Sequence, residues 1–171
     1  IEVLTQPHRI YDWSHFRLRR GWLSFALLWG ACSVSLLPVT AQNLVFNGGF
    51  EEMNWCPNDF TQNELKTLKY WKQSNSGTPD HFDACAAGSG AGVPKNAFGQ
   101  QAPLEGDAYS GIVLYSASKP EYREYLHAEL KRPLVEGEWI CAEWWVCAAD
   151  AGRLITDGLA LHFGDRPIKE V

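Results

Sequence analysis

Acidic and histidine side chains that could transfer protons occur at two places in the chain. Asp80 and His81 are adjacent and Asp83 follows closely, a spacing that could place a carboxylate beside an imidazole for acid–base catalysis. Glu51 and Glu124 could form the carboxylate pair of a glycosidase if the fold brought them together. Neither spacing is diagnostic, and polar loop residues explain both pairs better.

Familiar catalytic and cofactor motifs do not occur in the sequence. Ser110 lies in Tyr-Ser-Gly, which is not the G-x-S-x-G elbow of α/β-hydrolases. There is no HExxH, CxxC or phosphate-loop pattern. We therefore predict no catalytic residue and no required cofactor.

Aromatic residues in or beside loops offer a different chemistry, which is the binding of a sugar against a flat apolar face. We predict that Trp55, His81, Tyr109 and Tyr115 bind such a ligand together with a few polar groups. Core packing is the alternative for each of them. Trp71 lies within an apolar segment and is expected in the core.

The N-terminal part of the chain has the ordered features of a secretory signal. Three arginines within residues 17–20 precede an apolar run at 22–37, which suits a signal peptide and is short for a membrane-spanning helix. A proline follows, and small or β-branched residues then predict cleavage between Ala41 and Gln42. An uncleaved anchor and a buried core helix are the alternatives.

This interpretation divides the chain into three parts. Residues 1–16 are an upstream extension without clear periodicity, to which we assign no role in the fold. Residues 17–41 are the signal peptide, and residues 42–171 form the exported domain. The whole chain has a net charge of -5, and the leader carries more arginines than acids, so the exported part is more acidic still. No cluster of basic residues follows the leader, so nucleic acid is a poor candidate for a partner.

Short apolar segments separated by turns make up the exported part. Their patterns predict strands at 44–46, 108–116, 122–130, 139–149 and 159–163, whereas residues 72–106 are rich in turn-forming residues and predict a long loop region. Short strands without a long amphipathic helix predict an all-β sandwich. The strands are few for two sheets, so we expect the domain to be truncated at its C-terminus.

The strand predicted at 139–149 has the strongest alternation. Its core face is expected to carry four residues, Ile140, Ala142, Trp144 and Val146. Cys141 and Cys147 lie on the other face and are separated by roughly 20 Å along a straight strand, too far to form a disulfide with each other.

Residues 43–51, Asn-Leu-Val-Phe-Asn-Gly-Gly-Phe-Glu, form an opening motif that resembles the start of galactose-binding-like jelly rolls, the fold of many carbohydrate-binding modules. More narrowly, the chain resembles the exported N-terminal modules of Bacteroidetes envelope proteins, which are often attached to an OmpA-like peptidoglycan-binding domain. The matching segments are 55–57, 71, 76–82, 84–86, 93–96, 99–101, 106–111 and 122–126. The family's closing strands and an OmpA-like segment do not occur in this sequence.

The resemblance implies two structural features. Cys56 and Cys85 both lie in matching segments and flank the loop-rich region, so a disulfide between them is expected, with two separate thiols as the alternative. A structural Ca²⁺ near the first strand is also implied, with Asn47 and Glu51 as ligands, because a tight turn there exposes carbonyls beside a carboxylate. The alternative is a turn followed by a solvated acid pair.

Together these features predict a non-catalytic module exported to the periplasm, outer membrane or cell surface, with no membrane-spanning segment after cleavage. We expect it to bind carbohydrate or another cell-wall or surface ligand, as the N-terminal part of a larger OmpA-like protein. A structural or adhesive spacer without a glycan ligand is the first alternative, and a secreted hydrolase is the second.

Overall fold

The described part of the chain consists of strands and loops, which confirms the predicted all-β class. The computed structural model describes residues 2–12, as backbone, and residues 42–60, 64–154, 156 and 158–168. These residues contain no α-helix, and the helical turns among them are two short 3-10 helices, η1 (Glu64–Thr67) and η2 (Ala84–Ala86). The signal peptide predicted at 17–41 lies outside the described residues.

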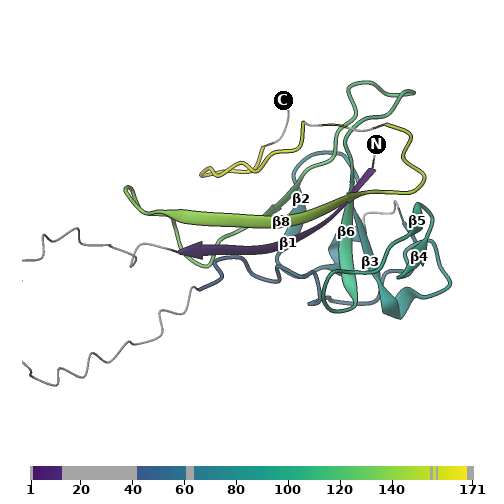
Figure 1. Cartoon of the computed structure of the whole chain (residues 1–171), viewed down its shortest axis with the longest axis horizontal. Helices are drawn as coiled ribbons and strands as arrows, with labels where there is room; N and C mark the ends of the chain where they lie inside the picture. The colour runs from purple at the N-terminus through teal and green to yellow at the C-terminus, as the bar shows by residue number, and fades with distance from the viewer. Residues whose placement is uncertain (1, 13–41, 61–63, 155, 157, 169–171) are drawn as a thin grey trace, which may run out of the picture.

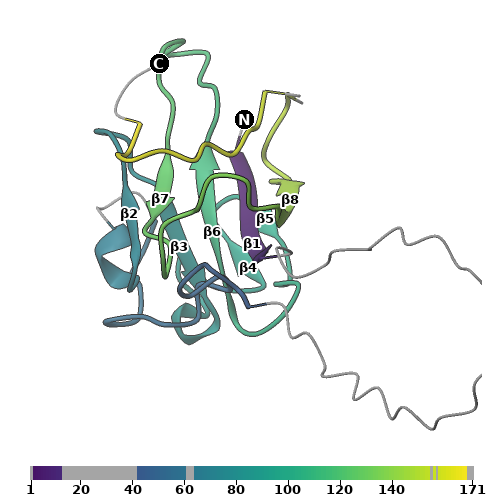
Figure 2. The same cartoon turned by 90° about the vertical axis from the view of Figure 1, so that its left-hand side faces the viewer.

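The strands are arranged in a four-stranded sheet and two smaller pairs (Figures 1 and 2). The larger sheet has the order β3-β6-β1-β8, and the pairs are β2–β7 and β4–β5, all antiparallel. The strands are β1 (Glu2–Asp12), β2 (Trp71–Gln73), β3 (Asp80–Asp83), β4 (Lys95–Asn96), β5 (Gly99–Gln100), β6 (Ala108–Val113), β7 (Leu126–Ala128) and β8 (Ile140–Ala148).

Strand β6 is flanked by β3 on one side and β1 on the other, and its side chains are buried on both faces of the sheet. On one face, Ala108 packs with the Phe50, Leu65 and Leu68 cluster, which Leu126 from β7 also joins. On the other face, Tyr109 packs in a second cluster with Phe82 from β3. Burial on two faces explains why small and apolar residues follow one another in β6 without a polar side.

Strand β8 confirms the predicted strand but only part of its predicted core face. Ile140 and Ala142 pack against Leu44 and Val45, as expected. Val146, on the same face, is 46% exposed. Cys147, on the opposite face, packs instead against the Phe82 and Tyr109 cluster. The core therefore lies on one face at the start of β8 and on the other at its end, because loops cover the second face there.

Residues 1–16 were predicted to have no role in the fold, and this prediction is wrong. Residues Glu2–Asp12 form β1, which lies between β6 and β8. The register of β1 against β8 shifts between Pro7 and Arg9. A bulge tolerates a proline, which cannot donate a ladder hydrogen bond. The proline and the bulge interrupt the alternation that would have identified this strand in the sequence.

Other segments also differ from expectation. In the 44–46 segment, an isolated bridge between Val45 and Leu130 replaces the predicted strand. Residues 159–163 form no strand, and Leu161 and Phe163 are exposed. The loop region predicted at 72–106 contains β3, β4 and β5. Polar residues of β3 are buried, so alternation of apolar and polar residues does not reveal it.

Candidate functional site

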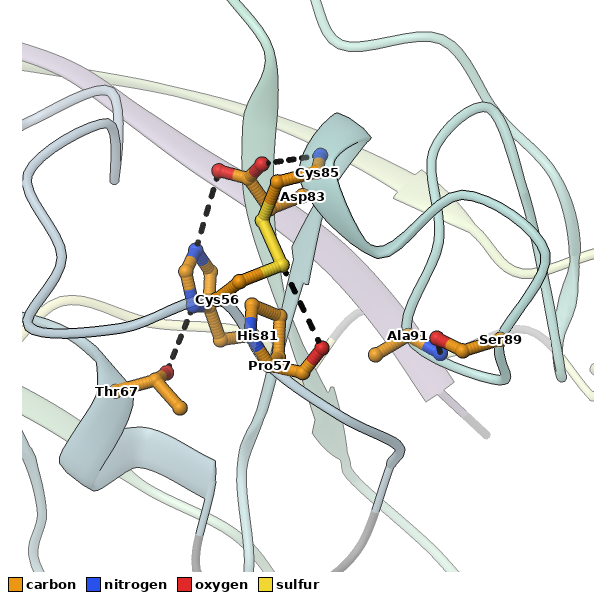
Figure 3. The surroundings of a disulfide bond; sticks show 8 residues. All are labelled: Cys56, Pro57, Thr67, His81, Asp83, Cys85, Ser89 and Ala91. Atoms are coloured by element: carbon orange, nitrogen blue, oxygen red, sulfur yellow. Dashed lines mark hydrogen bonds and ion pairs between the residues drawn. A yellow bond between two sulfur atoms is a disulfide. The ribbon is translucent and has the colours of Figure 1, made fainter.

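A disulfide joins Cys56 to Cys85 and confirms the predicted pairing, with the two Cα atoms 6.0 Å apart. Cys56 follows the opening motif, and Cys85 lies in η2, directly after β3. The bridge therefore holds a surface loop against the end of β3 (Figure 3). Cys141 and Cys147 are free, as their separation along β8 requires.

The side chains of Asp80, His81 and Asp83 lie in the interior, so the structure corrects the prediction that His81 contacts a surface ligand. His81 Nδ1 lies 2.7 Å from the Thr67 hydroxyl, and Asp83 accepts a 2.7 Å hydrogen bond from the Cys85 N–H. Figure 3 shows the imidazole between Thr67 and Asp83, beside the disulfide. The cluster connects η1, β3 and η2 within the core.

His81 is a neutral core residue at pH 7. Its Nε2 atom is buried and has no hydrogen-bond partner among the described residues. The nearest carboxylate oxygen, Asp83 Oδ2, is 3.9 Å away, beyond hydrogen-bonding distance. Burial therefore dominates and lowers the pKa of His81 to about 4, with the backbone of Phe50 acting weakly in the opposite direction.

Glu51 attaches the opening motif to the start of β6. Its carboxylate accepts hydrogen bonds from the Asp107 N–H at 3.1 Å and from the Ala108 N–H at 3.2 Å. Partial burial raises the pKa of Glu51, while these two N–H groups act in the opposite direction. A methyl group on Gly106 would collide with the Glu51 carboxylate, so the glycine leaves room for this contact.

Glu124 performs the same function at the other end of β6. It is only 2% exposed. Its carboxylate accepts hydrogen bonds from the Val113 N–H at 2.7 Å, the Thr78 N–H at 3.0 Å and the Tyr122 hydroxyl at 2.5 Å. A methyl group on Gly77 would lie 2.7 Å from Glu124 Cγ. This buried carboxylate therefore connects the segment before β3, the end of β6 and the segment before β7.

The structure does not bring Glu51 and Glu124 together. They bind opposite ends of β6, at Ala108 and Val113. A strand of this length spans roughly 16 Å at about 3.3 Å per residue, whereas the two carboxylates of glycosidases lie about 5–10 Å apart. Both glutamates hold backbone groups of the sheet in place.

Asn47 is fully engaged in the turn of the opening motif. Its amide nitrogen donates to the carbonyls of Glu52 at 2.8 Å and Lys69 at 3.1 Å, and its amide oxygen accepts from the Glu52 N–H. Its own carbonyl accepts from the Phe50 N–H and the Trp71 indole. The turn is therefore stabilised by side-chain and backbone hydrogen bonds together.

The calcium site expected at Asn47 and Glu51 stays a prediction. The oxygens that would bind the ion already accept hydrogen bonds from N–H groups. Ca²⁺ takes six to eight oxygen ligands. Among the residues that the structure describes, no group of three or more potential metal ligands comes together.

The predicted aromatic ligand site is not assembled in one place. Tyr109 is buried, and its hydroxyl accepts a 2.6 Å hydrogen bond from Asn96. Tyr115 is partly buried beyond the Val113 end of β6, with the Arg123 guanidinium 5.6 Å from its ring centre. Trp55 lies at the other end, beside the disulfide. Of the aromatic residues predicted to bind a ligand, Trp55 alone is largely exposed, at 54%.

The backbone around Trp55 is fixed on both sides. Asn54 donates to the carbonyls of Lys66 at 3.0 Å and Leu68 at 3.3 Å, and Cys56 is held by the disulfide. Farther along the same loop, Phe60 packs edge-to-face on Phe98, which in turn packs on Phe82 of the core. Exposed Asn58 and Asp59 lie between these attachments. An exposed indole is thus presented on a rigid loop with polar neighbours.

Several residues that hold the two ends of β6 and the Trp55 loop in place carry no signal in the sequence. Thr67 faces His81, Asn54 supports the Trp55 loop, and Thr78 and Tyr122 bind Glu124. Each depends on contacts between segments that are distant in the chain. Trp55 and Cys56 belong to a segment that resembles the family, which is the one sequence signal that pointed here.

The described residues contain no helix that combines the length and apolar character needed to cross a membrane. No protein-family model, curated protein or solved structure matches this chain. The geometry of the described residues therefore carries the functional argument.

Proposed function

We propose that this protein is a non-catalytic, exported cell-envelope module with a galactose-binding-like jelly-roll fold, which binds carbohydrate through a site centred on Trp55. In this proposal it forms the N-terminal part of a larger OmpA-like protein. The resemblance of the opening motif and of the segments that follow it supports the family and the location.

The exposed indole of Trp55 on a rigid loop is the observation that carries the binding proposal. An aromatic face provides apolar contact area for a sugar ring, and a preformed backbone lowers the entropy lost on binding. The disulfide, the Asn54 hydrogen bonds and the Phe60–Phe98 contact supply that preformed backbone. The neighbouring Asn58 and Asp59 can donate to or accept from sugar hydroxyls.

The disulfide also supports the proposed location. Disulfides persist in oxidising compartments and are rare in the cytosol. The bridge between Cys56 and Cys85 therefore favours a mature domain outside the cytoplasm, in agreement with the leader predicted from the sequence.

A spacer without a ligand is the second candidate, and the polar clusters favour it. Glu51, Glu124 and Asp83 are all used to hold backbone N–H groups of the domain itself. A domain that uses its acids internally can position a neighbouring domain without binding a glycan. The same observation makes the hydrolase the weakest of the three candidates.

A glycan array followed by titration calorimetry on the full chain tests the proposal. We expect Trp55→Ala to weaken binding to the best glycan at least tenfold, which corresponds to about 1.4 kcal/mol. Trp139→Ala is the matched control, since Trp139 is 80% exposed but lies directly before β8, away from the disulfide. Absence of binding to any cell-wall or host glycan would favour the spacer, and equal loss in both variants would remove Trp55 from the site.

A further inference from the structure

A second exposed aromatic ring lies at the far end of the short ladder that carries Trp55. Residues 52–54 pair with residues 67–69 through antiparallel backbone hydrogen bonds. Trp55 comes directly after the first of these segments, and Tyr70 comes directly after the second. Because the segments are antiparallel, the two rings leave the ladder at opposite ends, roughly 13 Å apart along it at about 3.3 Å per residue.

The Tyr70 ring is stacked on Phe46 and remains accessible to solvent. The two ring centres are 4.8 Å apart, and the ring planes differ by 11°. The Lys131 ammonium lies over the same Phe46 ring, 5.4 Å from its centre. Tyr70 is 46% exposed although Phe46 covers one of its faces, so its exposed surface includes the other face. The stack therefore ends in an open aromatic surface against which a sugar ring can pack.

The backbone that carries this ring is fixed on both sides. Tyr70 has a left-handed conformation, with a φ of 70°, which a bulky residue rarely adopts. The Lys69 carbonyl accepts a 3.1 Å hydrogen bond from the Asn47 side chain, and the Trp71 indole donates to the Asn47 carbonyl at 2.9 Å. Strained conformations persist where the surroundings determine them, and they are frequent at ligand sites. The open ring is thus preformed in its place.

The surface between the two rings is polar. Glu52, Lys66 and Lys69 are exposed on the ladder or directly beside it. Their carboxylate can accept hydrogen bonds from sugar hydroxyls, and their ammonium groups can donate to them. A sugar chain that lies along the ladder would therefore meet an aromatic face, then polar groups, then a second aromatic face.

We propose that Tyr70 forms a second sugar subsite and that the ligand is an extended glycan chain, which lies along the ladder with one ring on Trp55 and a later ring on Tyr70. This inference rests on the proposed function, because Trp55 provides the first subsite. A fragment too short to reach from one aromatic ring to the other uses Trp55 alone. Two subsites on one chain act together, so affinity should rise with the length of the glycan.

The test is titration calorimetry on the full chain with a disaccharide and a hexasaccharide fragment of the best glycan from the array. Tyr70→Gly removes the ring and suits the left-handed backbone. We expect it to weaken hexasaccharide binding at least about fivefold and to leave disaccharide binding unchanged. Trp55→Ala should weaken both, and Tyr70→Phe should weaken neither.

Trp145→Ala is the matched control for this second subsite. Trp145 is 54% exposed, and alternation along β8 places it on the same face as Cys147. That face packs against the Phe82 cluster, on the other side of the sheet from the Phe50 cluster that Trp71 joins. We therefore expect Trp145→Ala to bind both fragments as the unaltered chain does.

Three results would overturn the inference. These are an unchanged hexasaccharide affinity in Tyr70→Gly, an equal loss for both fragments while circular dichroism shows the fold intact, and an affinity of the unaltered chain that does not rise with glycan length. The last measurement needs no variant, so it decides even if Tyr70→Gly does not fold. If Trp55→Ala still weakens binding in these cases, the proposed function stands and the second subsite alone is rejected. Absence of glycan binding rejects both.

Discussion

The two ends of β6 are each held by a glutamate carboxylate, and the two glutamates differ in their surroundings. Glu124 at the Val113 end is buried and binds three segments of the chain. Glu51 at the Ala108 end is exposed and binds two successive backbone N–H groups. The end with the exposed glutamate also has the disulfide, whereas the other end depends on the buried carboxylate.

This difference shows that the same interaction has different consequences in different surroundings. A buried donor that loses its acceptor cannot turn to water, whereas an exposed donor can. The domain therefore uses a covalent bridge where its carboxylate is exposed and a hydrogen-bond network where its carboxylate is buried.

Removal of the Glu124 carboxylate is expected to have the largest effect. Glu124→Ala leaves the Val113 and Thr78 N–H groups and the Tyr122 hydroxyl without their acceptor, so we expect the free energy of unfolding to fall by about 3–5 kcal/mol. Chemical denaturation measures this change. Glu121→Ala, at an exposed position nearby, should change it by less than about 0.5 kcal/mol. A loss below about 1 kcal/mol in Glu124→Ala would mean that the two ends of β6 are held equally.

Acidification is expected to have the next largest effect, through His81 in the core between the two ends. Burial lowers the pKa of His81 to about 4, whereas in the unfolded chain its pKa is near 6.5. Between these two pH values the imidazole is therefore protonated in the unfolded chain and neutral in the folded chain. Stability that is fully present above pH 6.5 is therefore lost as the pH falls toward 4, by about 3 kcal/mol.

Two glutamine variants identify the group responsible for this pH dependence. His81→Gln should remove most of the slope of unfolding free energy against pH in that window. Burial also lowers the pKa of His127, so His127→Gln is the matched control and should keep most of the slope. The assignment to His81 fails if the two variants lose equal parts of it.

Substitution of Glu51 is expected to have the smallest effect. Since burial raises the pKa of Glu51, the ionised carboxylate is less favourable in the folded than in the unfolded chain, and a neutral amide removes this cost while keeping one acceptor oxygen. Glu51→Gln should therefore change the free energy of unfolding at pH 7 by less than about 1 kcal/mol. A loss as large as that of Glu124→Ala would contradict the comparison.

The fold could be predicted in part, wherever a strand is long or alternates. The segments at 108–116 and 139–149 were recognised because their apolar residues recur at strand spacing, and β6 and β8 lie there. Strand β3 was missed, because its acids and histidine are buried and bonded to distant residues. Strand β1 was missed, because a proline at a bulge hides its alternation.

The candidate site was predictable where the signal is local or covalent. The pairing of Cys56 with Cys85 followed from the resemblance of the segments that contain them, and the exposed Trp55 lies beside it. Burial of His81 and Tyr109 could not be predicted, because it arises from loops that close over them. The separation of Glu51 and Glu124 required the register of β6 with its neighbours.

Gly77 and Gly106 each make room for one of the two glutamates. A methyl group at position 77 would lie 2.7 Å from Glu124 Cγ and 3.0 Å from the Arg123 backbone carbonyl, so this position has no room for a larger residue unless the backbone moves. Each glycine therefore leaves the space that is occupied by a glutamate side chain far from it in the sequence. In any descendant of this sequence, we expect each glycine and its glutamate to be replaced together or both to be retained.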